Sequence, residues 1–525
     1  MRQKRVSGAA ADTIFAAPEL AEVLESCLSC KGCVGECPSG VDMTRLKSEL
    51  LQQKYDRHRL PLRSWAFARM SLFEGFGSWV RPLYNYFASA KWSSALLKRI
   101  LKFAPARNIP TLSQITMRKL VRQDGRRTCE HGGALSRSRQ VIRAADDAGC
   151  EDGRSPLPQA ASVRPQPKVY LFADEFTNYQ EAELGLTFAR LLRALGYEVE
   201  IPRHRESGRA AISKGDLRRA RRLACVNVEL LADIVSEDVP LVGIEPSCIL
   251  SFRDEYPDLV PPELRDKARS LGRNCLLYDE FLAREIAAGR ISADAFRRAL
   301  VPLDESAGAA GCENGSSAPG AAVSGATGCK SGNSAPGMAV ASSVPLQIWL
   351  HGHCHQKALV GIEKTASVLR TLLPDADLHV IPSGCCGMAG SFGYEREHYE
   401  TSMAIGEMVL FPAVRKAMAQ AASALGTRVA SVPEAHKESA PGTLAGPAAM
   451  TPGTMASGAV TSADGMKPAG EGGRNAGRQR YTQFCHQSGL TVVLAPGTSC
   501  RQQILDGTGV QALHPVELLY RSLKA

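Results

Sequence analysis

KVYLFADEFTNYQEAELGLTFARLLRALGYEVEIP, residues 168–202, and LQIWLHGHCHQKALVGIEKTASVLRTLLPDADLHVIP, residues 346–382, follow the same order of elements. Each contains a strand of β-branched and aromatic residues, a loop, an amphipathic helix and a second strand. A further strand follows each unit, in PLVGIEPSC (240–248) and in TVVLAPGTSC (491–500). Strands that alternate with helices are typical of parallel α/β domains, so the chain is predicted to hold two related ones.

Cysteines stand where the strands of these units end. Cys354 and Cys500 each follow a strand, and Cys385 and Cys386 follow the second strand of the second unit. Sites in parallel sheets gather at the carboxyl ends of strands, so we expect these four cysteines to form a metal or redox site. Gly384 and Gly387 would permit the turn that adjacent cysteines need to serve one cluster. The alternative is that they are inert, buried cysteines that pack as small hydrophobes.

The first unit offers fewer thiols. Cys248 follows its third strand, and even together with Cys225 it supplies too few thiolates for a cluster. Cluster binding is therefore not expected in the first unit.

Histidines surround Cys354. His351, His353 and His355 alternate along the chain, which on a strand would place the three imidazoles on one face. They could bind zinc or iron, or they could bond nearby loops at the end of a strand. We favour the second interpretation for His351 and His355, and keep His353 as a candidate ligand or proton relay. Further candidates are Tyr394, Glu395 and His398 on the helix expected after the glycine-rich loop, and, more weakly, Cys485 and His486.

The N-terminal region contains a compact cysteine run. Cys27, Cys30, Cys33 and Cys37 are separated by two, two and three residues and are followed by Pro38. This is the bacterial ferredoxin pattern for a 4Fe–4S cluster. Four thiolates also suit zinc, but zinc sites more often use two separated pairs. The run therefore predicts a 4Fe–4S cluster, with a helix directly after it.

These observations give a domain plan and an α+β fold class. A helical, ferredoxin-like domain with the 4Fe–4S cluster is expected at 1–60, and a basic helical arm rich in aromatic residues at 61–122. A degenerate first cysteine-rich repeat is expected at 168–302 and a second at 345–525, both α/β with parallel sheets. Three flexible insertions, 123–167, 303–344 and 427–478, are rich in Gly, Ala, Ser and Pro, and the cysteines of the first two, Cys129, Cys150, Cys312 and Cys329, are treated as incidental.

The arm has two interpretations. Its amphipathic helices could pack onto the cluster domain, which we favour, or lie on a membrane surface.

The composition of the chain indicates its cellular compartment and the kinds of partner it could bind. Its 525 residues carry a net charge of +10, which could favour an anionic membrane or an acidic partner, while no nucleic-acid recognition motif is recognisable. Sixteen cysteines without a dense disulfide framework favour a reducing compartment. No secretory leader and no membrane-spanning stretch is recognisable. We expect a cytoplasmic protein, with peripheral contact at the inner face of the membrane as an option.

The motifs together resemble a known family. SCLSCKGCVGECPSGVDM, LFADEFTNY, GIEPSC, HGHCHQKAL, SGCCGMAGSFG and APGTSCRQQ are similar to the C-terminal iron–sulfur half of FAD-linked oxidases of the D-lactate, glycolate and D-2-hydroxyglutarate type. The two repeats resemble the cysteine-rich repeats of heterodisulfide reductases. The resemblance implies an iron–sulfur oxidoreductase that passes electrons from FAD, bound on a partner chain, to a quinone or a carrier protein.

The chain departs from that family in two places. The flavin domain and a first cysteine run, which the family carries upstream, are not found here, so Cys37 would ligate a partner's cluster or close a single cluster in this chain. The first repeat has Glu206-Ser207-Gly208 where the family usually has Cys-Cys-Gly.

Three hypotheses follow. The first is an electron-transfer subunit of a 2-hydroxy-acid dehydrogenase, with a second cluster at Cys354, Cys385, Cys386 and Cys500. The second is a thiol–disulfide reductase that works at those four cysteines. The third is a fragment of a larger FAD and iron–sulfur oxidase. No catalytic residue for hydroxy-acid oxidation is recognisable, and the sequence names neither substrate nor acceptor.

Overall fold

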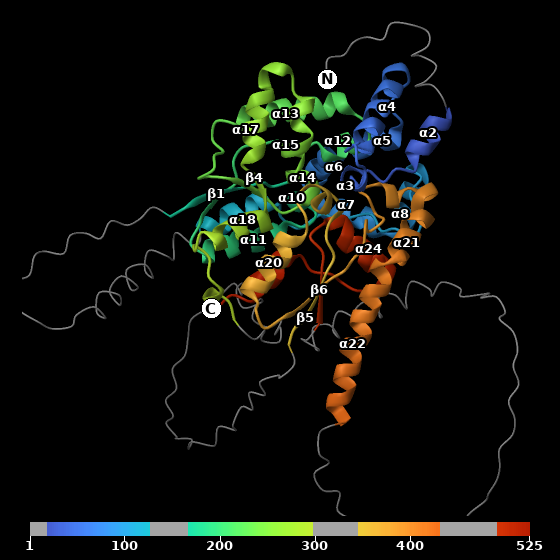
Figure 1. Cartoon of the computed structure of the whole chain (residues 1–525). Coiled ribbons are helices and arrows are strands. Elements are labelled where there is room, and N and C mark those ends of the chain that lie inside the picture. Colours follow the sequence, from blue (N-terminus) through green and yellow to red (C-terminus); the bar gives the residue numbers. More distant parts are fainter. Residues whose placement is uncertain (1–17, 127–165, 298–344, 431–490, 525) are drawn as a thin grey trace, which may run out of the picture.

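The computed structural model describes residues 18–126, 166–297, 345–430 and 491–524 (Figure 1). Helices surround two small parallel sheets, with strand orders β2-β1-β3-β4 and β6-β5-β7. The α+β class is thus confirmed at the level of a helix-rich fold with parallel sheets. The finer domain boundaries stay a prediction. Most of the three expected insertions, and Cys485 and His486, lie outside the described residues.

The first sheet is built from short strands within residues 166–297. Its central strand β1 pairs with β2 on one side and with β3 on the other, and β3 pairs with β4. Val169, Leu171, Leu241 and Val242 are fully buried, as expected for a parallel sheet covered by helices on both faces. The strands are β1 (Lys168–Leu171), β2 (Glu198–Glu200), β3 (Leu241–Gly243) and β4 (Cys275–Leu277).

The helices of this repeat connect and cover its strands. They are α10 (Glu175–Tyr179), α11 (Ala182–Ala194), α12 (Arg209–Ser213), α13 (Leu217–Leu231), α14 (Pro246–Ile249), α15 (Ser251–Asp254), α16 (Tyr256–Leu259), α17 (Arg265–Arg273) and α18 (Tyr278–Ala287), with 3-10 turns η1 (Pro262–Leu264) and η2 (Ala293–Ala295).

The second sheet repeats the first. Its central strand β5 pairs with β6 and β7 as β1 pairs with β2 and β3, and Leu494 and Leu513 form a parallel bridge where β4 would follow. Its elements are β5 (Gln347–Leu350), α19 (Cys354–Leu359), α20 (Glu363–Leu372), β6 (Asp377–Val380), η4 (Phe392–Tyr394), η5 (Arg396–His398), α21 (Tyr399–Met408), α22 (Leu410–Ala430), β7 (Thr491–Leu494), α24 (Thr498–Thr508) and α25 (Pro515–Arg521).

The two repeats pack against each other through two equivalent pairs of helices. Helix α11 of the first repeat packs against α25 of the second, and α20 of the second packs against α18 of the first. At the centre, the rings of Tyr278 and His514 are 4.7 Å apart and both residues are buried. Buried side chains of both sheets join in one hydrophobic core, so neither repeat is packed alone.

The N-terminal helices lie along this pair of repeats. They are α2 (Pro18–Glu25), α3 (Gly32–Glu36), α4 (Met43–Arg57), α5 (Leu62–Ala68), α6 (Met70–Gly77), α7 (Arg81–Ser89) and α8 (Lys91–Ile100). Helix α4 begins where predicted, because the side chain of Asp42 accepts a hydrogen bond from the Thr44 backbone N–H at 2.8 Å and caps it.

The arm differs from the favoured expectation in its packing partner. Helix α5 packs against α12, and α6 packs against α10, so the inner face of the arm rests on the first repeat rather than on the cluster domain alone. Arg107, just after the arm helices, reaches the second repeat. None of the helices in the described part of the chain has the length and apolarity needed to cross a bilayer.

One carboxyl group is buried under the arm. Glu74 of α6 is 2% exposed; one of its oxygens accepts a hydrogen bond from the Gln180 side chain, and the other has no partner within the described residues. Burial raises the pKa of Glu74 to about 8. The folded protein therefore keeps this side chain neutral at a pH where the unfolded chain has ionised it.

Substituting Glu74→Gln should stabilise the protein in alkaline solution. Unfolded Glu74 loses its proton near its usual pKa of 4.5 and folded Glu74 near 8, so the wild type loses up to about 5 kcal/mol as the pH rises through that window. Glutamine cannot ionise. Thermal unfolding should show the variant more stable at pH 9 and nearly equal to the wild type at pH 4.5. Exposed Glu49→Gln is the control, and a constant difference across pH would contradict the assignment.

Candidate metal and redox sites

Four cysteines of the second repeat converge at one edge of its sheet. Cys354 begins α19 directly after β5, Cys385 and Cys386 lie in the loop after β6, and Cys500 lies in the first turn of α24 after β7. Neighbouring thiols of this set shift each other's pKa in pairs, Cys354 with Cys385, Cys385 with Cys386, and Cys386 with Cys500. The expected convergence of these thiols is therefore present, while metal binding by them stays a prediction.

A glycine shapes the loop that carries the adjacent pair. Gly387 has a φ of 94°, and its N–H lies 3.3 Å from the Cys385 sulfur, which accepts the hydrogen bond. A Cβ at position 387 would lie 2.2 Å from the Ser402 carbonyl oxygen. A side chain is therefore excluded by both conformation and space. Gly384 has no neighbour within 4 Å of such a Cβ, so only one of the two glycines is required by contacts.

Two of the four thiols are shielded from solvent, and the other two, those of Cys354 and Cys385, are half-buried. Cys386 and Cys500 are 3% and 1% exposed. The hydrogen bond with Cys385 and then burial raise the pKa of Cys354. For Cys500, the hydrogen bond with Cys386 lowers the pKa, but burial and neighbouring thiols outweigh that effect and the pKa is raised. A buried group of neutral thiols gains from exchanging its protons for a metal, because thiolates then have a counter-charge.

The histidines do not form the strand that the alternation predicts. Strand β5 ends at Leu350, and His353 instead caps α19: its Nδ1 accepts a hydrogen bond from the His355 N–H at 3.1 Å. Its Nε2 lies 3.7 Å from a carboxylate oxygen of buried Glu245. The physical reason is the helix that begins at Cys354, whose free N–H groups take an imidazole as their acceptor.

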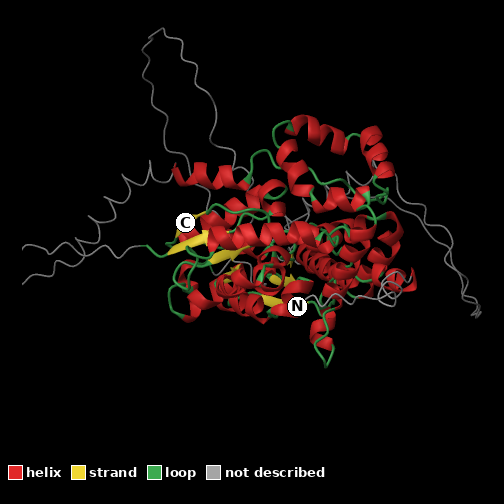
Figure 2. Cartoon of the chain, turned by 90° about the horizontal axis from the view of Figure 1, so that it is seen from above, coloured by secondary structure: helices red, strands yellow, loops and turns green. Residues whose placement is uncertain are grey.

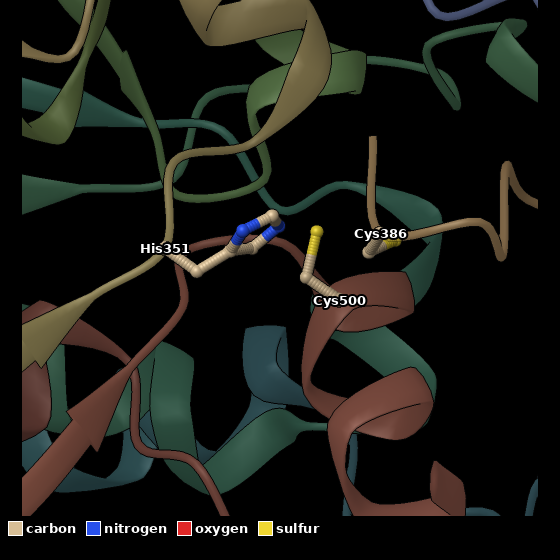
Figure 3. Close-up of side chains that lie close together, drawn as sticks. All are labelled: His351, Cys386 and Cys500. Carbon is tan, nitrogen blue, oxygen red and sulfur yellow. The ribbon is translucent and has the colours of Figure 1, made fainter. Parts of the chain in front are cut away.

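His351 and His355 each have one ring nitrogen that is left without a hydrogen bond in the described part of the chain. The Nε2 atoms of both are buried and have no hydrogen-bond partner within the described residues. His351 is oriented by its Nδ1, 2.7 Å from the Ser383 hydroxyl oxygen, and its ring points toward Cys386 and Cys500 (Figure 3). The potential ligand atoms of these three residues lie within 4.8 Å of one another. A buried nitrogen with no partner beside two thiols fits a metal ligand, so His351 joins His353, whose ligand atom lies within 4.8 Å of those of Cys354 and His355, as a candidate.

The N-terminal run forms a curved loop that continues into a short helix. Ser29 and Lys31, which separate the cysteines, have φ values of 53° and 62°, and the run passes through the short helix α3. Backbone N–H groups of Ser29 and Met43 donate to the sulfurs of Cys27 and Cys33, each at 3.4 Å. Such bonds to sulfur are among the features that set the potential of iron–sulfur clusters. The thiolates, the curved loop and these donors fit a cluster.

Cys37 occupies a different environment from the rest of the run. It ends α3, and backbone N–H groups of Val41 and Ser39 lower the pKa of its thiol. These groups would favour a thiolate there.

A buried lysine fixes the run to the first repeat. Lys31, between Cys30 and Cys33, is 1% exposed, and its Nζ lies 2.9 Å from Asp42, 2.6 Å from Asp254 and 3.2 Å from Glu255. Burial opposes the charge, but Glu255 and Asp254 outweigh it and the pKa of Lys31 is raised. Sequence reasoning did not identify this residue, because two of its partners are more than two hundred residues away along the chain.

The two cysteine sites are neighbours. Helix α3 packs against α19, so the N-terminal run and Cys354 share an interface. A charge on Cys354 helps to raise the pKa of Cys30, after the larger effect of burial. The fold therefore places two thiol-rich sites side by side.

The first repeat keeps the layout without the thiols. Glu175 and Ser207 occupy the positions of Cys354 and Cys386, and Cys248 occupies that of Cys500. The Ser207 hydroxyl and N–H donate to the Glu175 carboxylate at 2.6 and 2.9 Å. Burial raises the pKa of Glu175 to about 7. A carboxylate and a serine thus fill this position with a hydrogen-bonded pair.

The remaining candidates lie elsewhere. Tyr394, Glu395 and His398 lie in or between the 3-10 turns η4 and η5, before the helix on which they were expected. Glu395 pairs with Lys214 and with His398, which satisfies its charge without a metal. Cys225 lies on α13 and is half-buried.

A second residue that sequence reasoning missed is Arg107. It is 1% exposed; its Nε donates to the Gly393 carbonyl at 2.9 Å, and one terminal nitrogen donates to the Gln503 side chain at 2.6 Å. The other terminal nitrogen pairs with Asp506. Arg107 thus ties the end of the arm to α24, which carries Cys500, and to the loop that follows Cys386.

Comparison with known proteins gives distant relatives. The chain is similar to D-2-hydroxyglutarate dehydrogenase of Pantoea ananatis, with 24% identity over 78% of this chain and 32% of that protein, and to the Escherichia coli K12 enzyme, with 24% identity over 76% and 31%. It is also similar to one subunit of the anaerobic glycerol-3-phosphate dehydrogenase of Escherichia coli K12, with 25% identity over 67% of this chain and 68% of that subunit. No family model and no solved structure matches.

These relatives support the predicted family broadly. All are dehydrogenases or a subunit of one, which agrees with the expected oxidoreductase class. The chain spans about a third of the length of the D-2-hydroxyglutarate dehydrogenases that it matches.

Replacing Gly387 should disturb the four-cysteine site more than replacing Gly384. In Gly387→Ala the positive φ and the clash with Ser402 should cost at least about 2 kcal/mol, whereas Gly384→Ala should stay within about 1 kcal/mol. Thermal unfolding and thiol titration of the folded protein would measure this. Gly387→Ala should also expose thiols to modification. Equal effects of the two variants would contradict the assigned role of Gly387.

Removing the buried ammonium of Lys31 should be costly. Lys31→Met would take the buried ammonium away from Asp254 and Glu255, which keep Arg45 and Arg209 as partners, at a cost of about 1.5 to 3 kcal/mol. The exposed pair of Lys267 with Asp233 is the control, and Lys267→Met should change stability by less than about 1 kcal/mol. Urea unfolding under anaerobic conditions would compare the two. A Lys31→Met protein as stable as the wild type would remove the ammonium as a structural requirement.

Proposed function

We propose that this chain is the iron–sulfur electron-transfer component of an FAD-linked 2-hydroxy-acid dehydrogenase. The observation that carries the proposal is the packing of α3 against α19, because it places the Cys27–Cys37 run beside the four-cysteine site. Two adjacent sites of redox-active ligands suit a relay, and the relatives are dehydrogenases.

The first site in this proposal is the N-terminal run. Cys27, Cys30, Cys33 and Cys37 would hold a 4Fe–4S cluster, which supplies one-electron redox chemistry when bound. The N–H groups of Ser29 and Met43 would stabilise negative charge on two of its sulfurs. Lys31 would hold the loop in place through its carboxylate partners.

The second site would hold a second iron–sulfur cluster. Its ligands would be Cys354, Cys385, Cys386 and Cys500, and His351 is an additional candidate. Flavin and hydroxy acid would bind to a partner flavoprotein, and a quinone or a carrier protein would accept the electrons. We propose a cytoplasmic location for the complex.

Burial disfavours thiol–disulfide exchange with an external substrate at two of the four cysteines. Such exchange requires a thiolate that a disulfide can reach, and Cys386 and Cys500 are almost fully covered, whereas Cys354 and Cys385 are half-buried. The relay needs no such access, because electrons transfer between sites without contact with solvent.

Cysteine variants test the relay. After anaerobic reconstitution, Cys30→Ser should lower the iron content per chain and the absorbance near about 400 nm, while Cys225→Ser, on α13, should leave both unchanged. Cys385→Ser/Cys386→Ser should keep the iron of the N-terminal run. When the protein is reduced with dithionite and desalted, this double variant should be reoxidised by menadione more slowly than the wild type. A wild-type chain that holds no iron would overturn the proposal. Turnover of a small organic disulfide, lost in the double variant, would replace the relay by the reductase.

A further inference from the structure

Helices α5 to α8 expose large apolar side chains to an unusual extent. Of the twenty large apolar side chains that are exposed in the described part of the chain, fourteen lie between residues 62 and 100. Trp79 is 87% exposed, Phe76 74% and Trp92 62%. We call these fourteen the arm surface: Leu62, Trp65, Leu72, Phe73, Phe76, Trp79, Val80, Leu83, Tyr86, Phe87, Trp92, Leu96, Leu97 and Ile100. So many exposed large apolar side chains within one segment are typical of an interaction site.

The charges of the same segment are all of one sign at the surface. Residues 61–102 contain seven basic residues, Arg63, Arg69, Arg81, Lys91, Lys98, Arg99 and Lys102. The segment's single acidic residue is Glu74, which is buried and faces Gln180. Arg63 pairs with Glu397 and Arg69 with Asp216 of the repeats, so the excess positive charge of the segment comes from its other five basic residues.

A basic cavity adjoins the arm surface. It has a volume of about 1210 Å³ and lies between α8 and the second repeat. Lys91, Lys98, Arg99, Lys102 and Arg396 line it, together with one acidic residue, Glu397. Five cations against one carboxylate suit an anionic group, such as a phosphate, at the margin of an apolar surface.

The arm is fixed to the second repeat at its end. The Arg396 N–H donates to the Lys102 carbonyl at 3.0 Å, and the Ala104 N–H donates to the Tyr394 carbonyl at 2.8 Å. Arg107 then contacts α24, which carries Cys500. A partner bound to the arm would thus be connected to the four-cysteine site through these contacts.

We propose that the arm surface docks on the face of an anionic lipid bilayer. Aromatic side chains interleaved with lysine and arginine, with Glu397 as the single carboxylate at the cavity, match the apolar boundary and the negative headgroups of such a bilayer. The short helices α6, α7 and α8 would lie in the interface, with Phe76, Trp79 and Trp92 inserted. The basic cavity would take a phospholipid headgroup.

Vesicle sedimentation of the full chain, as isolated anaerobically, tests this docking. The protein should sediment with phosphatidylcholine vesicles that contain phosphatidylglycerol and much less with phosphatidylcholine alone, and added salt should release it. Phe76→Ala/Trp79→Ala should lower the partition coefficient by at least about tenfold. Three of the four tryptophans lie on the arm surface, so binding should also shift tryptophan emission to shorter wavelength.

Matched variants away from the arm provide the controls. Ile234→Ala removes an exposed apolar side chain near α13, and Lys267→Gln removes a charge on α17, which lies apart from α8 in Figure 1. Both should bind as the wild type does, whereas Lys91→Gln/Arg99→Gln should lose affinity for the anionic vesicles. The iron content of each variant would show that it has folded.

Two results would overturn the proposal. One is a wild-type chain that fails to bind anionic vesicles. If that chain also forms dimers, and Phe76→Ala/Trp79→Ala dissociates them, a second copy of the chain covers the arm surface instead. The other is full binding by the folded double variant. Neither result depends on electron transfer, so the docking and the proposed function fail separately.

Discussion

The buried ammonium of Lys31 is the interaction on which the arrangement of the chain depends. It lies within the cysteine run, where Lys31 adopts a left-handed conformation, and it is surrounded by carboxylates of α15 and of the loops that flank α4 and α15. A charge that is hidden from water requires these partners, because desolvation without them is prohibitive. The N-terminal loop is thereby held at one place on the first repeat, which leaves α3 in contact with α19.

The first repeat serves mainly as the support for this arrangement. It retains the sheet order of the second repeat, but Glu175 and Ser207 form a hydrogen-bonded pair where the second repeat has thiols. Its outer elements hold the cysteine run through Asp254 and Glu255 and the arm through α10 and α12. The exchanged packing of α11 with α25 and of α18 with α20 then fixes the second repeat in the same core. Helices surround the strands in the view of Figure 2.

Much of the fold could be predicted from the sequence because its signals are local. The repeated strands and helices, the helix after Asp42 and the cysteines at strand ends all follow from short patterns. The alternation of His351, His353 and His355 failed as a strand signal, because the N-terminus of α19 takes His353 as its cap. The orphaned Nε2 of His351 could not be predicted, since its setting depends on Ser383 and Cys500 from other loops.

By itself, the sequence determined the two parallel α/β repeats, the ferredoxin spacing and the set of cysteines available for redox chemistry, because spacing and periodicity act over a few residues. Tertiary structure alone decided that the cysteine run meets Cys354, that Lys31 and Arg107 are buried at the junctions, and that the arm surface is left uncovered. Those outcomes depend on contacts between residues that are more than two hundred positions apart in the sequence. Charge, burial and packing act together in such contacts, so short sequence patterns do not predict them.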